Sequence, residues 1–278
     1  MVDPYPSGKA DLPALSVIIP CYNEESVIEV TVKNLSKALQ GAGILYEILC
    51  VNNASSDRTE DILLKLTAEI PGARYMNTPP VSGYGVAVRW GLEFFSGKAV
   101  VIVMADGSEE PADVIAFYRK IEEGYDCAFG NRFVQTASVV GYPRFKRILN
   151  RCGNALIAWI SHADYGDFTN GFKCYQKHVI DDMKPLYSDQ FNLTIEMSIN
   201  AVLSGARYAV VPNSWKDREA GVSKFKLLKQ SKLYLKTVAY CWLRSNLRGK
   251  NWQKYQEDLT AAKKASFGGS KSDPVQAP

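Results

Sequence analysis

The sequence predicts an α/β protein with a mostly parallel central sheet and helices on both of its faces. Through the first half of the 278 residues, short apolar runs alternate with longer segments that repeat their apolar residues at helical spacing. The apolar runs are almost continuous in Val, Ile and Leu, which is typical of strands buried on both faces in a parallel sheet. This alternation favours a doubly wound, Rossmann-like architecture.

Strands and helices follow one another regularly through the first half. We expect strands at residues 15–20, 45–51, 73–77, 99–104 and 126–130. We expect helices at residues 25–40, 57–69, 84–96 and 111–123. Two of the helix starts carry clear signals, because Ser55-Ser56-Asp57 offers side chains that cap a helix and Pro111 suits a first helical turn.

The second half departs from this alternation. Its expected elements are a helix at 144–161, an extended piece at 168–175, a helix at 188–204, a strand at 207–211, a polar loop from Asn213 to Ser223 and a helix at 225–246. The tail from Ala265 to Pro278 is rich in Ser, Gly, Lys and Pro, so we expect it to be disordered.

Composition and cysteine placement bound the class of protein. The hydrophobic fraction of 46% is ordinary for a globular chain with a sizeable core. The cysteines are scattered without a C-x-x-C pair, which favours reduced thiols in a cytosolic protein over disulfides or zinc. No stretch reaches the roughly 18–20 apolar residues of a membrane-spanning helix, and residues 1–12 lack the apolar run of a signal peptide.

The net charge of +4 is small, but the basic residues are concentrated in two segments. Residues 141–151 contain four basic residues and no acid, and residues 216–254 contain eleven against two acids. The second segment also carries aromatic and aliphatic residues, a combination that favours contact with a membrane surface. The alternative is a helix that packs on the core and turns a basic face to water. Nucleic-acid binding is disfavoured, because no stacking platform accompanies the charge.

Two of the apolar runs end abruptly in polar residues. Residues 15–24 read LSVIIPCYNE, and residues 100–106 read VVIVMAD. In an open α/β sheet, ligands bind at the carboxyl ends of the strands, where backbone N–H groups of loops and helix N-termini are presented. A carboxylate at such a strand end, here Asp106, can hold a divalent cation over a diphosphate. The two runs together therefore predict a nucleotide-diphosphate site.

A series of motifs in sequence order extends this prediction. Five of them are Ser-Val-Ile-Ile-Pro-Cys-Tyr-Asn-Glu at 16–24, Glu-Ile-Leu-Cys-Val-Asn-Asn-Ala-Ser-Ser-Asp-Arg-Thr at 47–59, Gly-Tyr-Gly-Val-Ala-Val-Arg at 83–89, Met-Ala-Asp-Gly-Ser at 104–108 and Gly-Asn-Arg-Phe at 130–133. This series resembles the family 2, GT-A-fold glycosyltransferases. Three more are Tyr-Pro-Arg-Phe-Lys-Arg at 142–147, Asp-Phe-Thr-Asn-Gly-Phe-Lys at 167–173 and Arg-Glu-Ala-Gly-Val-Ser-Lys at 218–224. These resemble one branch of the family, the polyprenyl- and dolichyl-phosphate sugar synthases.

The resemblance extends over residues 14–245. Together with the charge and composition of the C-terminal part, it predicts an N-terminal extension at 1–13, a GT-A catalytic domain at 14–224, a basic amphipathic helical region at 225–262 that contacts a membrane surface, and a disordered tail at 263–278.

The same resemblance implies roles for individual residues. The expected nucleotide-binding residues are Pro20, Tyr22, Glu24, Asn52, Asn53, Gly83, Ala105 and Asp106. The expected ligands of Mg²⁺ or Mn²⁺ are Asp106 and Ser108, with Glu109 as a further candidate. The expected catalytic residues are Asp106, Arg132, Arg218 and Lys224, of which the cations neutralise the leaving diphosphate. The acceptor phosphate is expected at Lys146, Arg147, Asn150, Thr169 and Ser223, beside Asp167.

Each of these roles has a simpler structural alternative. Glu24 can complement a helix dipole, and Asp106 can cap the turn that follows it. Asn52 and Asn53 can be turn residues before a helix. If they read a base instead, their amides both donate and accept hydrogen bonds, which leaves uracil and guanine open. The cations can be ordinary surface residues of a basic protein.

The chain departs from the family pattern at the metal site. Where the family commonly has Asp-x-Asp, this chain has Met104-Ala105-Asp106, so the first carboxylate is absent. One Asp, two phosphate oxygens and waters can still hold Mg²⁺. The departure weakens the expectation of metal dependence, and it is the support for a minor hypothesis, a binding protein that kept the fold without the chemistry.

We predict an inverting glycosyltransferase that moves a mannose- or glucose-type hexose from a GDP- or UDP-sugar to a polyprenyl or dolichyl phosphate. A phosphate acceptor is already an anion and needs no strong base, and both histidines lie outside the motifs. The second hypothesis is a saccharide or other hydroxyl acceptor with Glu196 as the base, although a structural hydrogen-bonding role is favoured for Glu196. The expected location is cytoplasmic, peripheral on the cytosolic face of a membrane, held by the 225–246 helix or by a membrane-anchored partner protein.

Overall fold

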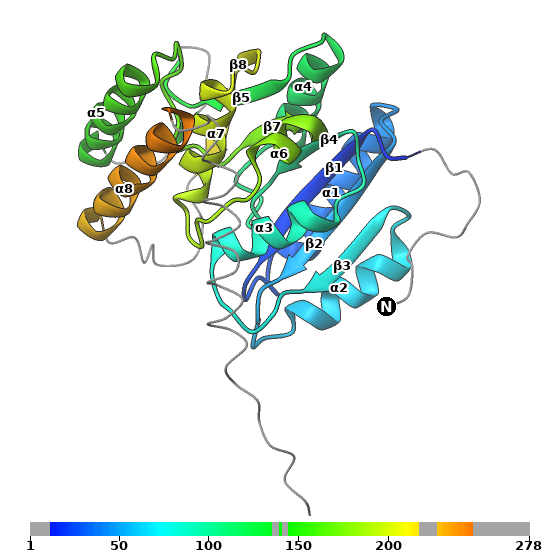
Figure 1. Ribbon diagram of the computed structural model, residues 1–278. Coiled ribbons are helices and arrows are strands. Elements are labelled where there is room, and N and C mark those ends of the chain that lie inside the picture. The colour runs from blue at the N-terminus through cyan, green and yellow to red at the C-terminus, as the bar shows by residue number, and fades with distance from the viewer. Residues whose placement is uncertain (1–11, 135–138, 141–143, 217–226, 247–278) are drawn as a thin grey trace, which may run out of the picture.

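A seven-stranded, mostly parallel sheet forms the centre of the computed structural model, which describes residues 12–134, 139–140, 144–216 and 227–246 (Figure 1). The strand order is β3-β2-β1-β4-β7-β5-β8. The strands are β1 (Leu15–Cys21), β2 (Tyr46–Asn52), β3 (Ala73–Asn77), β4 (Ala99–Ile102), β5 (Cys127–Asn131), β7 (Lys173–Gln176) and β8 (Tyr208–Pro212). A separate parallel pair consists of β6 (Val139–Val140) and β9 (Trp215–Lys216). The α/β class predicted from the sequence is confirmed.

Helices cover both faces of this sheet. The helices are α1 (Ile28–Gly41), α2 (Thr59–Glu69), α3 (Tyr84–Phe94), α4 (Pro111–Glu122), α5 (Arg144–Ser161), α6 (Lys177–Met183), α7 (Leu193–Leu203) and α8 (Leu227–Asn246). One hydrophobic cluster joins α1, α2 and α4 to the sheet, and the other joins α3 and α5–α8 to it. Strand β1 serves both clusters, because Val17 and Ile19 point to the first and Ile18 to the second, as the period of two in a strand requires.

The register of the parallel strands brings their carboxyl ends to one edge. Cys21 at the end of β1 pairs with Asn52 at the end of β2, and Asn52 pairs with Asn77 at the end of β3. Ile18 of β1 pairs with Ile102, the last residue of β4. The loops that follow β1, β2 and β4 therefore start close together, which is the arrangement that the sequence predicted for a ligand site.

The second half adds features that the sequence did not indicate. Strand β7 runs antiparallel to both β4 and β5, while the other strand pairs of the sheet are parallel, which agrees with the mostly parallel sheet that was predicted. Helix α7 begins at Leu193 rather than near residue 188. The reason is that Glu196 in its first turn accepts hydrogen bonds from the backbone N–H groups of Tyr187 (2.9 Å) and Ser188 (2.8 Å), which holds the preceding residues in a turn.

Candidate active site

The loops after β1 and β2 are tied to each other by a set of hydrogen bonds. The Asn23 N–H donates to Ser55 Oγ (3.1 Å), and Asn23 Oδ1 accepts from the Ser56 N–H (2.7 Å). The Glu24 N–H donates to Thr59 Oγ1 (2.8 Å). Of the expected nucleotide-binding residues in this region, Pro20 is buried in β1, Glu24 is half-buried and Tyr22 is exposed. These hydrogen bonds fix the backbone that carries Tyr22 and Glu24 at the carboxyl edge of the sheet.

The amides of Asn52 and Asn53 are used inside the protein. The Asn52 amide donates to Asn77 Oδ1 (2.8 Å), and the Asn53 amide donates to Thr78 Oγ1 (2.7 Å). Asn53 Oδ1 accepts from the Gly83 N–H (2.7 Å). Both asparagines are buried, so they hold the loop between β3 and α3 in place. Asn53 also donates to Val81 O (2.9 Å), so both of its amide hydrogens are used, and it could donate to a base only by giving up one of these bonds.

The Gly-Tyr-Gly motif owes its glycines to close packing. A Cβ at Gly83 would lie 2.3 Å from Asp189 O, and a Cβ at Gly85 would lie 2.4 Å from Ser188 O. The Gly85 N–H also donates to Asp189 O (3.0 Å). These two glycines let the start of α3 approach the turn before α7. For Gly83, which the sequence assigned to the nucleotide, the structure therefore supplies a packing reason for the residue type.

Two carboxyl groups lie at the end of β4. Asp106 Oδ1 accepts from the Ser108 N–H (3.1 Å), and Glu109 Oε2 accepts from the Met104 N–H (3.0 Å). Asp106 is half-buried, whereas Ser108 and Glu109 are buried, and Thr31 Oγ1 fixes the loop by donating to Ala105 O (2.8 Å). Burial, together with the nearby charge of Asp106, raises the pKa of Glu109 to about 7.

This geometry bears on the missing first carboxylate. The residue at position 104 is Met, yet the Glu109 carboxyl group is bound to the backbone N–H of that same position. A second acidic group therefore reaches the neighbourhood of the absent Asp from five residues further along the chain. The sequence offered one signal for it, an acid directly after the Asp-Gly-Ser turn.

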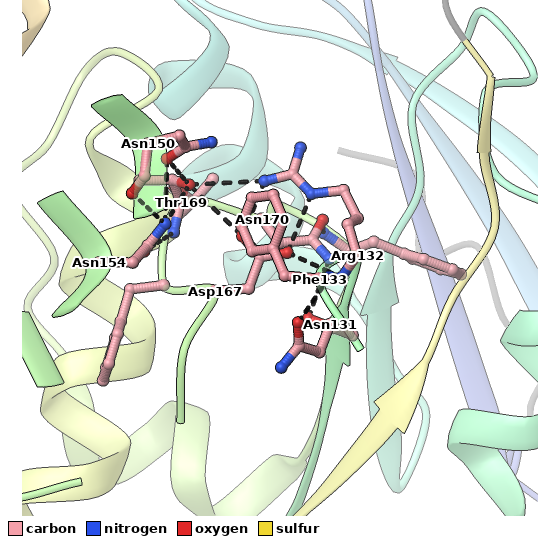
Figure 2. Close-up of polar contacts among 12 residues, drawn as sticks. Asn131, Arg132, Phe133, Asn150, Asn154, Asp167, Thr169 and Asn170 are labelled. Carbon is pink, nitrogen blue, oxygen red and sulfur yellow. Dashed lines mark hydrogen bonds and ion pairs between the residues drawn. The ribbon is translucent and has the colours of Figure 1, made fainter. Parts of the chain in front are cut away.

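Arg132 at the end of β5 is clamped by Asp167, as Figure 2 shows. Asp167 Oδ2 accepts from the Arg132 backbone N–H (3.0 Å) and from Nε (2.9 Å), and Asp167 Oδ1 accepts from Nη2 (2.8 Å). The Arg132 side chain is 11% exposed and the Asp167 side chain 0%. Strands β4 and β5 both run antiparallel to β7, which lies between them, so their carboxyl ends lie at the same edge of the sheet. The charge of Arg132 also acts to lower the pKa of Glu109.

Thr169 joins the clamp to helix α5 (Figure 2). Its hydroxyl donates to Asn150 Oδ1 (2.7 Å) and accepts from Arg132 Nη2 (3.4 Å). The Asn154 amide donates to Thr169 Oγ1 (3.2 Å), and Asn154 Oδ1 accepts from the Thr169 N–H (3.1 Å). The structure thus brings together Arg132, Asn150 and Thr169, three of the residues that the sequence assigned to the site. Asn154 was not predicted.

Lys173 lies beneath this cluster and was also missed. Its ammonium group is buried and donates to Phe168 O (3.0 Å) and Asn170 O, so it holds the turn that carries Asp167 and Thr169. Burial lowers the pKa of Lys173 to about 7, against the opposing effect of the Asp167 charge. The available sequence signal was a lysine among the apolar residues of a strand, which is a rare place for one.

The remaining sequence predictions divide into two groups. Arg218, Ser223 and Lys224 lie outside the described residues, as do the side chains of Lys146 and Arg147, although the backbone of those two belongs to α5. Glu196 is buried and bound to two backbone N–H groups, which agrees with the structural role favoured for it. His162 and His178 are exposed.

The donor atoms at the end of β4 suit a hard divalent cation. Carboxylate and hydroxyl oxygens are the ligands that Mg²⁺ and Mn²⁺ prefer, and Asp106, Ser108 and Glu109 offer that set. Within the described ranges, no group of three or more His, Cys, Asp or Glu side chains has metal-binding geometry. The chemistry of this donor set fits a cation that completes its shell with phosphate oxygens and waters.

Comparison with known proteins places the chain in a family. Residues 16–184 match the family described as Glycosyl transferase family 2. The chain belongs to that family. It is 28% identical over 216 residues to the polyprenol monophosphomannose synthase of Mycolicibacterium smegmatis, covering 75% of this chain and 79% of the relative. It is 29% identical over 215 residues to the dolichol-phosphate mannosyltransferase of Pyrococcus furiosus, covering 76% of this chain and 59% of the relative.

A further relative and a solved structure complete the comparison. The uncharacterized glycosyltransferase YkcC of Bacillus subtilis is 27% identical over 218 residues, and the chain covers 65% of its length. The fold resembles the glucosyl-3-phosphoglycerate synthase of Mycobacterium tuberculosis, solved with Mn²⁺, uridine diphosphate and phosphoglyceric acid. The TM-score is 0.64 at 19% identity, over 83% of this chain and 78% of that chain. The family 2 resemblance and the GT-A fold predicted from the sequence are confirmed.

Proposed function

We propose that this family 2 glycosyltransferase moves a hexose from a nucleotide-diphosphate sugar to a polyprenyl phosphate. The observation that carries the proposal is the meeting of two clusters in one region. An oxygen-rich cluster of Asp106, Ser108 and Glu109 follows β4, and Arg132, which is bonded to Thr169, follows β5 at the same edge of the sheet. Synthases named for polyprenol and dolichol phosphates are among the relatives, which supports this choice of acceptor.

The reaction would be a single displacement with inversion. An oxygen of the acceptor phosphate forms a bond to the anomeric carbon as the bond from that carbon to the β-phosphate oxygen breaks, and the nucleoside diphosphate leaves. No proton needs to be removed, because the acceptor is already an anion. A divalent cation, when bound, would supply charge for the departing diphosphate, and Asp106 with Ser108 and Glu109 would hold it.

The protein's own groups orient the reactants. Arg132 stabilises negative charge that grows on the diphosphate, and Asp167 keeps its guanidinium group in one position, so little reorganisation is needed during the reaction. Asn150 and Thr169 offer hydrogen-bonding groups for the acceptor phosphate, and Arg218, Ser223, Lys224, Lys146 and Arg147 are proposed to add to these sites. Tyr22 and Glu24, in the loop after β1, are proposed to contact the nucleoside.

A second candidate function is favoured by one observation. Glu109, with its pKa raised to about 7, has the acidity that suits a general base near neutral pH. A saccharide or other hydroxyl acceptor would need such a base, so Glu109 replaces Glu196 as the candidate for that hypothesis. With a hydroxyl acceptor, the turnover rate should then rise with pH around pH 7. Loss of that pH dependence in Glu109→Gln would establish this function.

The location is proposed to be the cytosolic face of a membrane. None of the described helices combines the length and apolar character required to cross a bilayer. Helix α8, at the start of the basic C-terminal segment, is proposed to contact the membrane surface, alone or together with a membrane-anchored partner protein.

A donor screen tests the proposed transfer. The purified chain with Mg²⁺ or Mn²⁺ is given each common UDP- and GDP-sugar, with and without a short-chain polyprenyl phosphate, and released nucleoside diphosphate is measured. Release that requires the lipid phosphate is expected, and it would also name the donor. Release only with a saccharide would move the assignment to hydroxyl transfer, and no release with any donor would overturn the proposal.

Two variants sharpen the screen. Asp106→Asn should abolish release while the circular dichroism spectrum stays that of the wild type. Glu110→Gln is the matched control, because Glu110 is an exposed acid next to the same cluster, and it should leave release unchanged. Near-normal release by Asp106→Asn would remove Asp106 from the site.

A further inference from the structure

Helix α5 has the opposite polarity to an ordinary surface helix. The residues that it turns inward include Asn150, Asn154 and Ser161, together with Ile157. The residues that it turns outward, at intervals of three and four, are mainly apolar: Ile148, Cys152, Leu156 and Trp159. Trp159 is 75% exposed and Ile148 61%. A helix on a soluble protein normally buries its apolar stripe, so an outward apolar stripe indicates a surface that is covered by something.

Helix α8 presents a similar outward face. Leu235, Trp242 and Leu243 are exposed on one side, while Val238 and Cys241 are buried on the other. Ile157 of α5 and both buried residues of α8 belong to the same hydrophobic cluster, which also includes residues of α7. Figure 1 draws α5 (green) and α8 (orange) at the same end of the molecule, away from β3. The two apolar stripes therefore belong to one region of the protein.

The charge of these helices indicates what covers them. Helix α5 carries four basic residues and no acid, and so does α8. Arg151, Lys232 and Lys236 are exposed near the apolar stripes. A second copy of the chain would bring this positive surface against itself, which is unfavourable for a two-fold contact. An anionic bilayer offers negative headgroups for the lysines and arginines, and an apolar interior for the side chains between them.

We propose that the outward faces of α5 and α8 together form a docking surface for an anionic lipid bilayer, with Trp159 and Trp242 seated at the boundary between headgroups and acyl chains. Tryptophan favours that boundary because its ring is apolar and its N–H is polar. The inference adds α5 to the membrane contact proposed for α8. It rests on the proposed function in one respect, the presence of a lipid acceptor at Asn150 and Thr169.

The inward face of α5 gives the docking surface a purpose. Asn150 and Asn154 hold Thr169 on the inner side, so one helix lies between the bilayer and the candidate acceptor site. A helix with its side chains is about 10 Å across. The phosphate of a polyprenyl phosphate whose chain stays in the bilayer would therefore have to extend only about 10 Å from the bilayer surface to reach Thr169.

Vesicle flotation with the full chain tests the docking surface without donor or acceptor. Vesicles of phosphatidylcholine alone and with a third of phosphatidylglycerol are compared. The wild type should float with the anionic vesicles and do so less at high salt. Leu156→Gln/Trp159→Gln should lower the partition coefficient at least about tenfold, since two apolar side chains lose their apolar contact. Trp242→Gln should lower it several-fold.

The matched control uses exposed apolar residues on the opposite face of the sheet. Val30 on α1 is 62% exposed and Leu64 on α2 is 58% exposed, so Val30→Gln/Leu64→Gln removes comparable apolar surface elsewhere. The control should float like the wild type. Equal flotation of the α5 variant and the wild type would overturn the proposal. The proposal would also be overturned if the wild-type chain did not bind vesicles, including the case in which sedimentation velocity shows that it self-associates through this face.

Turnover with a water-soluble, short-chain polyprenyl phosphate separates this inference from the proposed function. The α5 variant should keep wild-type turnover with that acceptor and lose turnover when a long-chain acceptor is embedded in vesicles. Loss of vesicle binding with full soluble turnover supports the docking surface. Normal vesicle binding without any turnover would leave the surface standing and remove the function.

Discussion

The clamp between Asp167 and Arg132 makes a strong prediction about stability. Asp167→Asn removes one negative charge from a pair in which the Asp167 side chain is fully buried and the Arg132 side chain nearly so. Asp167 accepts three hydrogen bonds from Arg132, at 3.0, 2.9 and 2.8 Å. An asparagine has one carbonyl oxygen for these donors, and its NH₂ group would face a guanidinium N–H.

The expected loss of unfolding free energy is about 3–5 kcal/mol, the cost of leaving one member of a buried ion pair without its partner. The cost is assigned to Arg132 alone, because Lys173, whose pKa burial lowers to about 7, is mostly uncharged at pH 7.5. Urea unfolding of the two proteins at pH 7.5 measures the difference.

A double-mutant cycle shows whether the pair itself is responsible. Arg132→Met removes the guanidinium group, and Arg132→Met/Asp167→Asn removes both charges. Because the double variant no longer buries an unpaired arginine, its loss should be at least about 2 kcal/mol smaller than the sum of the two single losses. Additive losses, or a loss below about 1 kcal/mol for Asp167→Asn, would refute the argument that this is a buried, mutually dependent pair.

Three further predictions concern metal binding, pH and packing. Glu109→Gln should weaken Mg²⁺ binding in the presence of a nucleoside diphosphate about tenfold or more by calorimetry, since a carboxylate ligand is lost, and adding Met104→Asp should restore much of it. Because the pKa of Lys173 is lowered from 10.5 to about 7, the unfolded chain holds more protons above pH 7. Unfolding free energy should therefore rise by about 2 kcal/mol between pH 7 and 8.5, and Lys173→Met should flatten that rise in urea titrations. Gly85→Ala should cost about 1–3 kcal/mol in thermal or urea unfolding, because its Cβ would meet Ser188 O at 2.4 Å. Gly153→Ala in α5, with nothing within 4 Å, should stabilise slightly; equal effects of the two would contradict the packing argument.

The first half of the fold could be predicted from the sequence because its signals are local. Most strands there are nearly continuous apolar runs, and the helices show their own periodicity, so no knowledge of distant residues was needed. The antiparallel direction of β7 was not predictable in the same way. It depends on pairing with β4 and β5, which lie far away in the chain, and a four-residue strand carries no mark of its direction.

The residues of the candidate site likewise divide into those that a local sequence signal indicated and those that were missed. Asp106 and Arg132 follow strands, and the sequence could place them at a strand end for that reason. Asn154 could not be found, because its importance comes from its contacts with Thr169 in another segment. Lys173 was missed although it carried a signal, a lysine among apolar strand residues, and it holds the turn just before β7. The amides of Asn52 and Asn53 make contacts that the sequence did not indicate, because they also hold the loop between β3 and α3.

Helix α5 shows why a polar inner face and an apolar outer face belong together. Asn150 and Asn154 contribute no hydrophobic burial, so the helix is held inward by hydrogen bonds to the Thr169 turn together with the packing of Ile157, Ala158 and Ile160. In water, such a helix leaves its apolar stripe exposed, at a cost that docking on a bilayer would remove. Membrane binding should therefore stabilise the inner hydrogen bonds as well, which couples arrival at the bilayer to order around Thr169. The amide protons of the Thr169 turn should exchange more slowly with solvent when the chain is bound to anionic vesicles than when it is free. Unchanged exchange on vesicle binding would show that the two faces of α5 act independently.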